Sequence, residues 1–101
     1  MTTIRRLPGA VADLDEIWEY IFAQNAAAAD RVLGRIIAAT DRLIDYPYSG
    51  QIRDEIGATA RGISVPPYVV LYRVVGNVVE VVRVMHTARN LLDAAADFST
   101  D

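Results

Sequence analysis

Two runs of β-branched residues on either side of Gly76-Asn77 constrain this chain more than any other feature. YVVLYRVV precedes the glycine and VVEVVRVMH follows the asparagine. A two-residue link of this kind between such runs predicts a β-hairpin. If Gly76 and Asn77 form the turn, Arg73 lies opposite Glu80 as a cross-strand pair of opposite charge. The sequence therefore predicts an antiparallel ribbon over residues 68–86.

Both faces of this ribbon are apolar over much of their length. Strand alternation gives the second face six aliphatic side chains, those of Val69, Leu71, Val75, Val78, Val82 and Val84. A pair of helices covers only one face, so the second face either meets a C-terminal segment or is the surface for a partner.

The N-terminal half of the chain predicts two amphipathic helices. Large apolar residues recur at spacings of three and four over residues 10–22 and again over residues 26–46. Pro8 stands where the first helix can begin, and the Asn25 side chain can cap the second. Because the connection between them is short, the helices should form an antiparallel hairpin.

Shorter segments complete the predicted fold. Residues 3–7 are expected as an edge strand, and residues 61–65 as a strand that Pro66-Pro67 stops. Residues 47–60 are expected as a loop, and LLDAAADF as a short helical turn. The predicted class is α+β: an N-terminal strand, an antiparallel helix hairpin and a three-stranded antiparallel sheet, in the order β-α-α-β-β-β.

Composition narrows the possible function. A chain of 101 residues, 52% of them apolar, is expected to form one domain over 1–101. With one histidine and no cysteine, we expect no metal and no cofactor. The net charge of −3, with arginine as the only basic residue type, argues against a general nucleic-acid binder. No apolar run reaches the length of a signal peptide or a membrane span, so a cytoplasmic location is expected.

Residues near the end of the second hairpin strand are the candidates for chemistry. A histidine beside arginines, here Arg83, His86 and Arg89, can move protons and bind phosphate, as RNA cleavage requires. Alternation places Arg83 and His86 on opposite faces, however, which favours ordinary surface arginines at a strand end. The carboxylates of Asp13 and Glu16, which share a helix face, are explained more simply by the start of a helix than by a metal.

Four segments in order resemble the RelE/ParE toxin superfamily. They are ADLDEIWEYI, RLIDYPYSGQIRDEI, YVVLYRV and VEVVRVMHTARN, which together span most of the chain. The resemblance implies a toxin of a type II toxin-antitoxin pair and a cognate antitoxin, similar to ParD or RelB, that wraps the toxin in a hetero-oligomer. The second ribbon face, with Val69, Leu71, Val82 and Val84, is the antitoxin surface that we expect.

The superfamily implies two activities. RelE-like toxins cut mRNA on the ribosome with lysines, an arginine after the tyrosine of the third strand and a tyrosine near the C-terminus. This chain departs from that pattern: it has no lysine, Val69 follows Tyr68, and no tyrosine follows Tyr72. Some relatives use a histidine at the end of the last strand, so His86 keeps this alternative open.

ParE-like toxins, which poison DNA gyrase, resemble the chain more closely. The resemblance rests on the helix with Trp18, the PYSG turn and the RVMH ending. We therefore favour a non-enzymatic gyrase inhibitor that does not itself bind specific DNA sequences. An inactive antitoxin-binding module is a third possibility. The expected target-binding residues are Arg61, Arg83, His86 and Arg89, whereas Tyr68 and Tyr72 are expected to support the fold.

Overall fold

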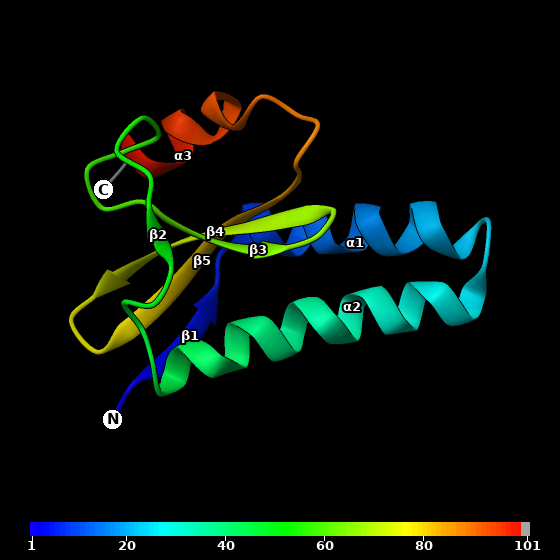
Figure 1. Ribbon diagram of the computed structural model, residues 1–101, viewed down its shortest axis with the longest axis horizontal. Helices are drawn as coiled ribbons and strands as arrows, with labels where there is room; N and C mark the ends of the chain where they lie inside the picture. The colour runs from blue at the N-terminus through cyan, green and yellow to red at the C-terminus, as the bar shows by residue number, and fades with distance from the viewer. Residues whose placement is uncertain (100–101) are drawn as a thin grey trace.

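The hairpin lies at the centre of a five-stranded sheet in a computed structural model that describes residues 1–99 (Figure 1). The strand order is β1-β5-β4-β3-β2. Only β1 runs parallel to its neighbour, β5; the other pairs are antiparallel. The strands are β1 (Thr3–Arg6), β2 (Gln51–Ile52), β3 (Arg61–Val65), β4 (Tyr68–Val75) and β5 (Val78–His86). The helices are α1 (Pro8–Phe22), α2 (Ala26–Asp41) and α3 (Ala95–Ser99), with 3₁₀ turns at Arg42–Ile44 and Leu91–Ala94.

The predicted register of the hairpin is confirmed near its turn. Gly76 has a φ of 62°, a conformation that glycine adopts without strain. Arg73 pairs with Glu80, and the Arg73 Nε lies 2.8 Å from a Glu80 carboxylate oxygen. This ion pair fixes the register by matching opposite charges across the two strands.

A β-bulge changes the register farther from the turn. Tyr72 pairs with Val81 while Leu71 pairs with Arg83, so β5 carries one extra residue at this point. Beyond it the faces exchange: Val84 packs in the core on the helix side, and Met85 packs on the other side. The predicted placement of Val84 on the second face was therefore wrong, because strict alternation does not continue through a bulge.

The helix hairpin forms as predicted, although α2 is shorter than expected. α1 begins at Pro8, and the Asn25 side chain caps α2 by accepting a hydrogen bond from the Ala28 N–H at 3.0 Å. α2 ends at Asp41 and tightens into the 3₁₀ turn rather than continuing to Tyr46. Figure 1 shows that the α1–α2 connection lies beyond the ends of the central strands.

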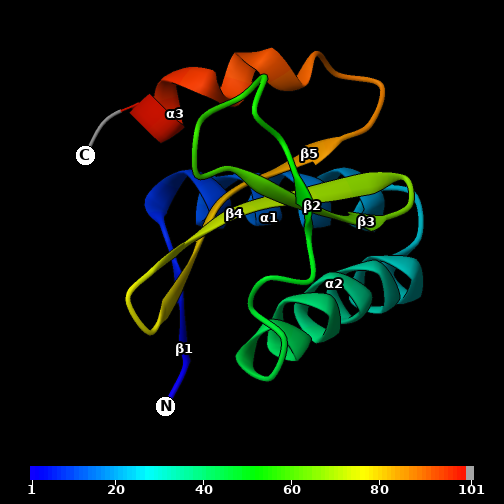
Figure 2. The same cartoon turned by 60° about the vertical axis from the view of Figure 1, so that its left-hand side comes forward.

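The sheet is covered on both faces (Figure 2). The helix hairpin covers one face, with a core of Ala10, Ile36, Ala39, Val70 and Val81. The other face is covered by α3 and by the segment before β3, which contribute Phe98, Ala94, Ile56 and Ala60. Of the two alternatives for the second face, the structure shows the C-terminal segment.

The antitoxin surface expected from the sequence is consequently not exposed. Val69, Leu71 and Val82 lie beneath α3 with 0–2% of their surface exposed, and Val84 is 3% exposed beneath the helices. A partner can reach these four side chains only if the covering elements move. The sequence analysis left a C-terminal cover open as the alternative to a partner surface, and that cover lies over Val69, Leu71 and Val82.

The predicted loop over residues 47–60 contains β2 and is fixed by a buried tyrosine. The Tyr72 hydroxyl accepts a hydrogen bond from the Gly50 N–H at 2.8 Å and donates one to the Pro47 carbonyl at 2.9 Å. A Cβ on Gly50 would lie 2.5 Å from that hydroxyl, so a larger residue would push the turn off the sheet. Burial raises the pKa of Tyr72. Within residues 1–99, no helix has both the length and the apolar character needed to cross a membrane.

Replacing Tyr72 with phenylalanine tests the role of this hydroxyl. The Gly50 N–H would lose its acceptor in a buried place, which should lower the free energy of unfolding by about 1–3 kcal/mol in urea denaturation. Tyr46→Phe is the matched control because Tyr46 is 67% exposed; it should change stability by less than about 0.5 kcal/mol. Equal effects of the two substitutions would contradict the role assigned to the Tyr72 hydroxyl.

Candidate functional site

An apolar groove of about 720 Å³ lies between α1 and the ends of β4 and β5. We call it the α1 groove. Its apolar lining comes from Ile17, Tyr20, Ile21, Val32, Pro67, Tyr68, Val84 and Met85. Its polar lining comes from Asp13, Glu16, Arg83, His86 and Arg89. The groove exists because the apolar stripe of α1 continues past the part of the helix that the sheet covers.

Two tyrosines illustrate the change from core to open surface along the groove. Tyr68 is 7% exposed and packs in the core, whereas Tyr20 on α1 is 69% exposed. Burial raises the pKa of Tyr68, and the neighbouring Tyr20 adds to the effect. The Tyr68 phenol therefore stays protonated in the physiological range, and the groove wall is uncharged there.

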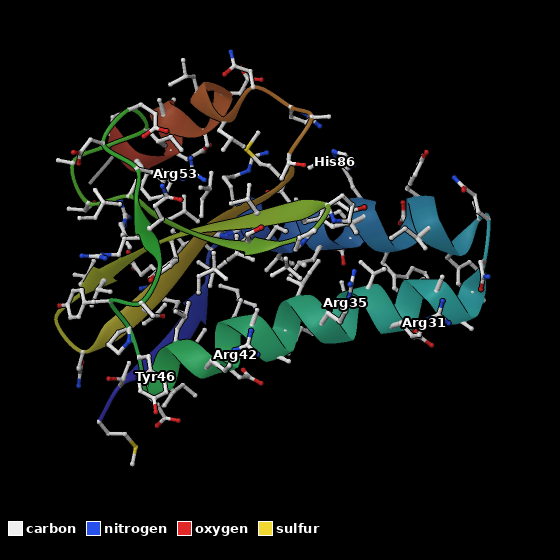
Figure 3. The ribbon with its side chains drawn as sticks, in the orientation of Figure 1. Arg31, Arg35, Arg42, Tyr46, Arg53 and His86 are labelled. Atoms are coloured by element: carbon white, nitrogen blue, oxygen red, sulfur yellow. The ribbon has the colours of Figure 1, made fainter. Side chains whose placement is uncertain are left out.

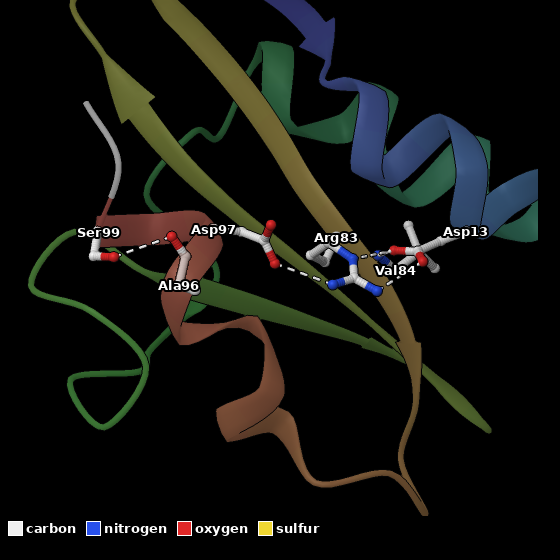
Figure 4. A network of polar contacts seen from close by, with 6 residues as sticks. All are labelled: Asp13, Arg83, Val84, Ala96, Asp97 and Ser99. Carbon is white, nitrogen blue, oxygen red and sulfur yellow. Dashed lines mark hydrogen bonds and ion pairs between the residues drawn. The ribbon is translucent and has the colours of Figure 1, made fainter.

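A network of ion pairs centred on Arg83 closes one end of the groove (Figure 4). The Arg83 Nε and Nη2 donate to the two Asp13 carboxylate oxygens at 2.7 and 2.9 Å, and Nη1 donates to Asp97 at 3.0 Å. Asp13 also accepts the backbone N–H of Val84 at 2.8 Å. One guanidinium thus connects β5 to α1 on one side and to α3 on the other.

The Asp13 and Asp97 carboxylates neutralise the charge of Arg83 within the protein. The hydrogen bond to Asp13 raises the pKa of Arg83 above its ordinary value, although desolvation opposes the shift. A bidentate arginine-carboxylate pair of this kind is a strong interaction. The geometry therefore gives Arg83 a structural role, where the sequence predicted a contact with a target. Asp13 is fixed by the same ion pair. Residues 1–99 contain no cluster of three potential metal ligands.

His86 and Arg89 lie at the opposite rim and are exposed. The His86 Nδ1 accepts a hydrogen bond from the Ala88 N–H at 3.0 Å, which leaves Nε2 as the protonated nitrogen of the neutral ring. The ring meets the Tyr68 ring edge to face, with 5.4 Å between centroids. The Arg89 N–H bonds the His86 carbonyl at 2.9 Å, so a tight turn holds both residues beside the groove.

Arg61 does not join these residues. It pairs with Tyr72 at one end of β3, whereas His86 pairs with Tyr68, which adjoins the other end of that strand. Its Nη1 donates to the carbonyls of Tyr48 and Gly50, both at 3.0 Å, and its guanidinium lies 5.1 Å from the centre of the Tyr48 ring. The structure thus uses Arg61 to hold the turn before β2.

The sequence prediction identified the rim of the groove but missed its floor and walls. Ile17 and Ile21 were assigned to the helix stripe that packs in the core, yet both remain only partly buried. Trp18, also on α1, is half-buried; it stacks on Phe22, and its indole N–H donates to Asp30 at 3.3 Å. The periodicity of the stripe gave no signal for this, because the groove depends on how far α1 is displaced along the sheet, with its second half beyond the strand ends (Figure 1).

Comparisons with known proteins agree with this architecture. The family model for the ParE toxin of type II toxin-antitoxin systems matches residues 4–91. The chain is 41% identical to Toxin RelE2 of Caulobacter vibrioides, covering 79% of this chain and 89% of that protein. It is 35% identical to Toxin ParE1 of the same organism, covering 80% and 84%.

The fold matches a solved structure as well. A chain of the chromosomal ParDE toxin-antitoxin system from P. aeruginosa superposes with a TM-score of 0.75 and 20% sequence identity, covering 85% of this chain and 96% of that one. The α+β fold is accordingly that of the RelE/ParE superfamily. The chain belongs to the ParE toxin family, the toxins of type II toxin-antitoxin systems.

Proposed function

We propose that this toxin inhibits DNA gyrase by binding rather than by catalysis, and that a cognate antitoxin similar to ParD neutralises it. The proposal rests on one observation: two of the arginines expected to contact the target are already bonded within the protein. Arg83 is bound to Asp13 and Asp97, and Arg61 is bound to backbone carbonyls. Arg83 and Arg89 both line the α1 groove with His86, and of these two arginines Arg89 stands outside the ion-pair network. We propose that the α1 groove rim with these two residues contacts the target.

A nuclease would need a different arrangement. Cleaving RNA requires proton transfer at two oxygens and positive charge around the phosphate. The groove is lined largely by apolar residues, and the Asp13 carboxylate in its lining is paired with Arg83. This composition favours a binding surface over a catalytic site. Either target, gyrase or the ribosome, would place the protein in the cytoplasm.

Ribosome-dependent cleavage of mRNA is the second candidate. Its support is the exposed His86 ring in the groove lining, whose Nδ1 accepts the Ala88 N–H. The relative named Toxin RelE2 is more similar in sequence than the relative named Toxin ParE1. The two candidates differ in what substitution of His86 and Arg89 should do.

Gyrase supercoiling and ribosome-dependent mRNA cleavage should be assayed with one preparation of the purified toxin. We expect gyrase inhibition with intact mRNA, and an inhibitory concentration raised about ten-fold or more by Arg89→Ala, as for a hot-spot arginine. Arg5→Ala is the control, since the Arg5 side chain is 70% exposed on β1, away from the groove. Cleaved mRNA that is lost in His86→Ala would overturn the gyrase proposal. If the toxin neither slows bacterial growth on expression nor inhibits gyrase, an inactive antitoxin-binding module would be favoured.

The α1 groove also fits the antitoxin. An apolar groove with a charged rim suits an amphipathic segment that buries apolar side chains and pairs its charges at the edge. The groove is open, whereas Val69, Leu71, Val82 and Val84 are buried. An antitoxin segment in the groove would cover His86 and Arg89 and so block the proposed target surface.

A charge placed in the groove tests this location. We expect Tyr20→Glu to weaken antitoxin binding by about ten-fold or more in calorimetry, because a carboxylate would be buried without a partner. Tyr46→Glu is the matched control: Tyr46 is 67% exposed against 69% for Tyr20, and it lies beyond the C-terminal end of α2, away from the groove (Figure 3). Equal affinities of the two variants would place the antitoxin elsewhere.

A further inference from the structure

Three arginines form an exposed row along α2 and the start of the 3₁₀ turn that follows it. Arg31, Arg35 and Arg42 are all exposed, and Figure 3 shows them spaced along the helix. Offsets of four and seven residues keep their side chains within a narrow sector of the helix, at separations of roughly 6 and 10 Å along its axis. We call these residues the arginine row.

The charge of this row is not neutralised by the rest of the fold. Arg35 donates to the Pro66 carbonyl at 3.2 Å, which carries no charge. Within residues 1–99, the side chains of Arg31 and Arg42 take part in no hydrogen bond or ion pair. The aspartates of α2 point elsewhere: Asp30 accepts from Trp18 on α1, and Asp41 lies 3.8 Å from Arg6 on β1.

A hollow lies between the first two arginines. It is lined by Arg31, Val32, Gly34, Arg35 and Ala38, so its floor is apolar and its rim is basic. A Cβ on Gly34 would meet nothing within 4 Å, and Gly34 does not have a positive φ. The fold therefore does not require glycine here, although glycine is a poor residue for the interior of a helix.

We propose that the arginine row is a docking surface for an acidic amphipathic helix of another protein. A helix lying along α2 would present carboxylates at the same four- and seven-residue offsets, opposite the three arginines. An apolar side chain between those carboxylates would enter the hollow above Gly34, where the absence of a side chain allows close approach. This surface is separate from the α1 groove and does not depend on the nature of the toxin's target.

The charge distribution favours a helix over a nucleic acid. The chain carries a net charge of −3, and Asp30, Asp41 and Asp45 flank the row. A long polyanion would meet these carboxylates, whereas a helix with isolated carboxylates would meet only the arginines. An apolar floor also gives a phosphate backbone nothing to bind, but it accepts an aliphatic side chain.

The test uses a labelled synthetic helical peptide of about 18 residues, roughly five turns. It carries three glutamates at the offsets of the row and one leucine between the first two; a second peptide has glutamine at each glutamate position. Fluorescence anisotropy is measured with the full chain. We expect the glutamate peptide to bind about ten-fold more tightly, and R31Q/R42Q to remove most of that difference. Arg5→Gln should leave the affinity within about two-fold.

Two substitutions of Gly34 separate docking from folding. Gly34→Ala and Gly34→Leu both favour the helix, so each should retain or raise the thermal midpoint. Alanine should leave peptide binding within about two-fold, whereas leucine should fill the hollow and weaken it about ten-fold. Equal binding of both peptides, or equal effects of R31Q/R42Q and Arg5→Gln, would overturn the proposal. Tighter, row-dependent binding of a single-stranded oligonucleotide would also overturn it and assign the row to nucleic acid.

Discussion

The ion pair between Asp13 and Arg83 is the interaction on which the arrangement of this protein depends. The two residues are separated by 70 positions in the sequence, and their bidentate contact joins α1 to β5. Asp97 adds α3 to the same guanidinium, and the Val84 N–H adds the backbone just beyond the bulge. Because Asp13 is 8% exposed, losing Arg83 would leave a largely buried carboxylate without its counter-ion.

The surface features follow from this arrangement. α1 is held against β5 near its beginning, so its second half projects beyond the sheet and leaves the α1 groove open (Figure 1). α2 packs beside it and presents the arginine row on the outer face of the hairpin (Figure 3). The toxin thus offers two unlike surfaces: an apolar one at the sheet end and a basic one along α2. Both surfaces lie on the helix hairpin, which projects beyond the ends of the strands that support it (Figure 1).

The sequence predicted the parts of the fold that local patterns determine. The hairpin register near Gly76, the cap at Asn25 and the order of the elements follow from turn chemistry and periodicity. The bulge was not predictable, since nothing in the local pattern marks it, and it exchanged the faces of Val84 and Met85. The roles of Arg61 and Arg83 also depend on partners distant in the sequence. The local pattern therefore identified two charged residues without showing what they bind.

A double-mutant cycle on Asp13 and Arg83 tests this account most directly. Urea unfolding of the wild type, Asp13→Asn, Arg83→Gln and the double variant yields the coupling energy between the two side chains. If the pair holds α1 to the sheet, the coupling energy should be about 2 kcal/mol or more, with each single variant strongly destabilised. A coupling energy near zero would mean that the fold does not depend on this pair and would return Arg83 to the set of target contacts.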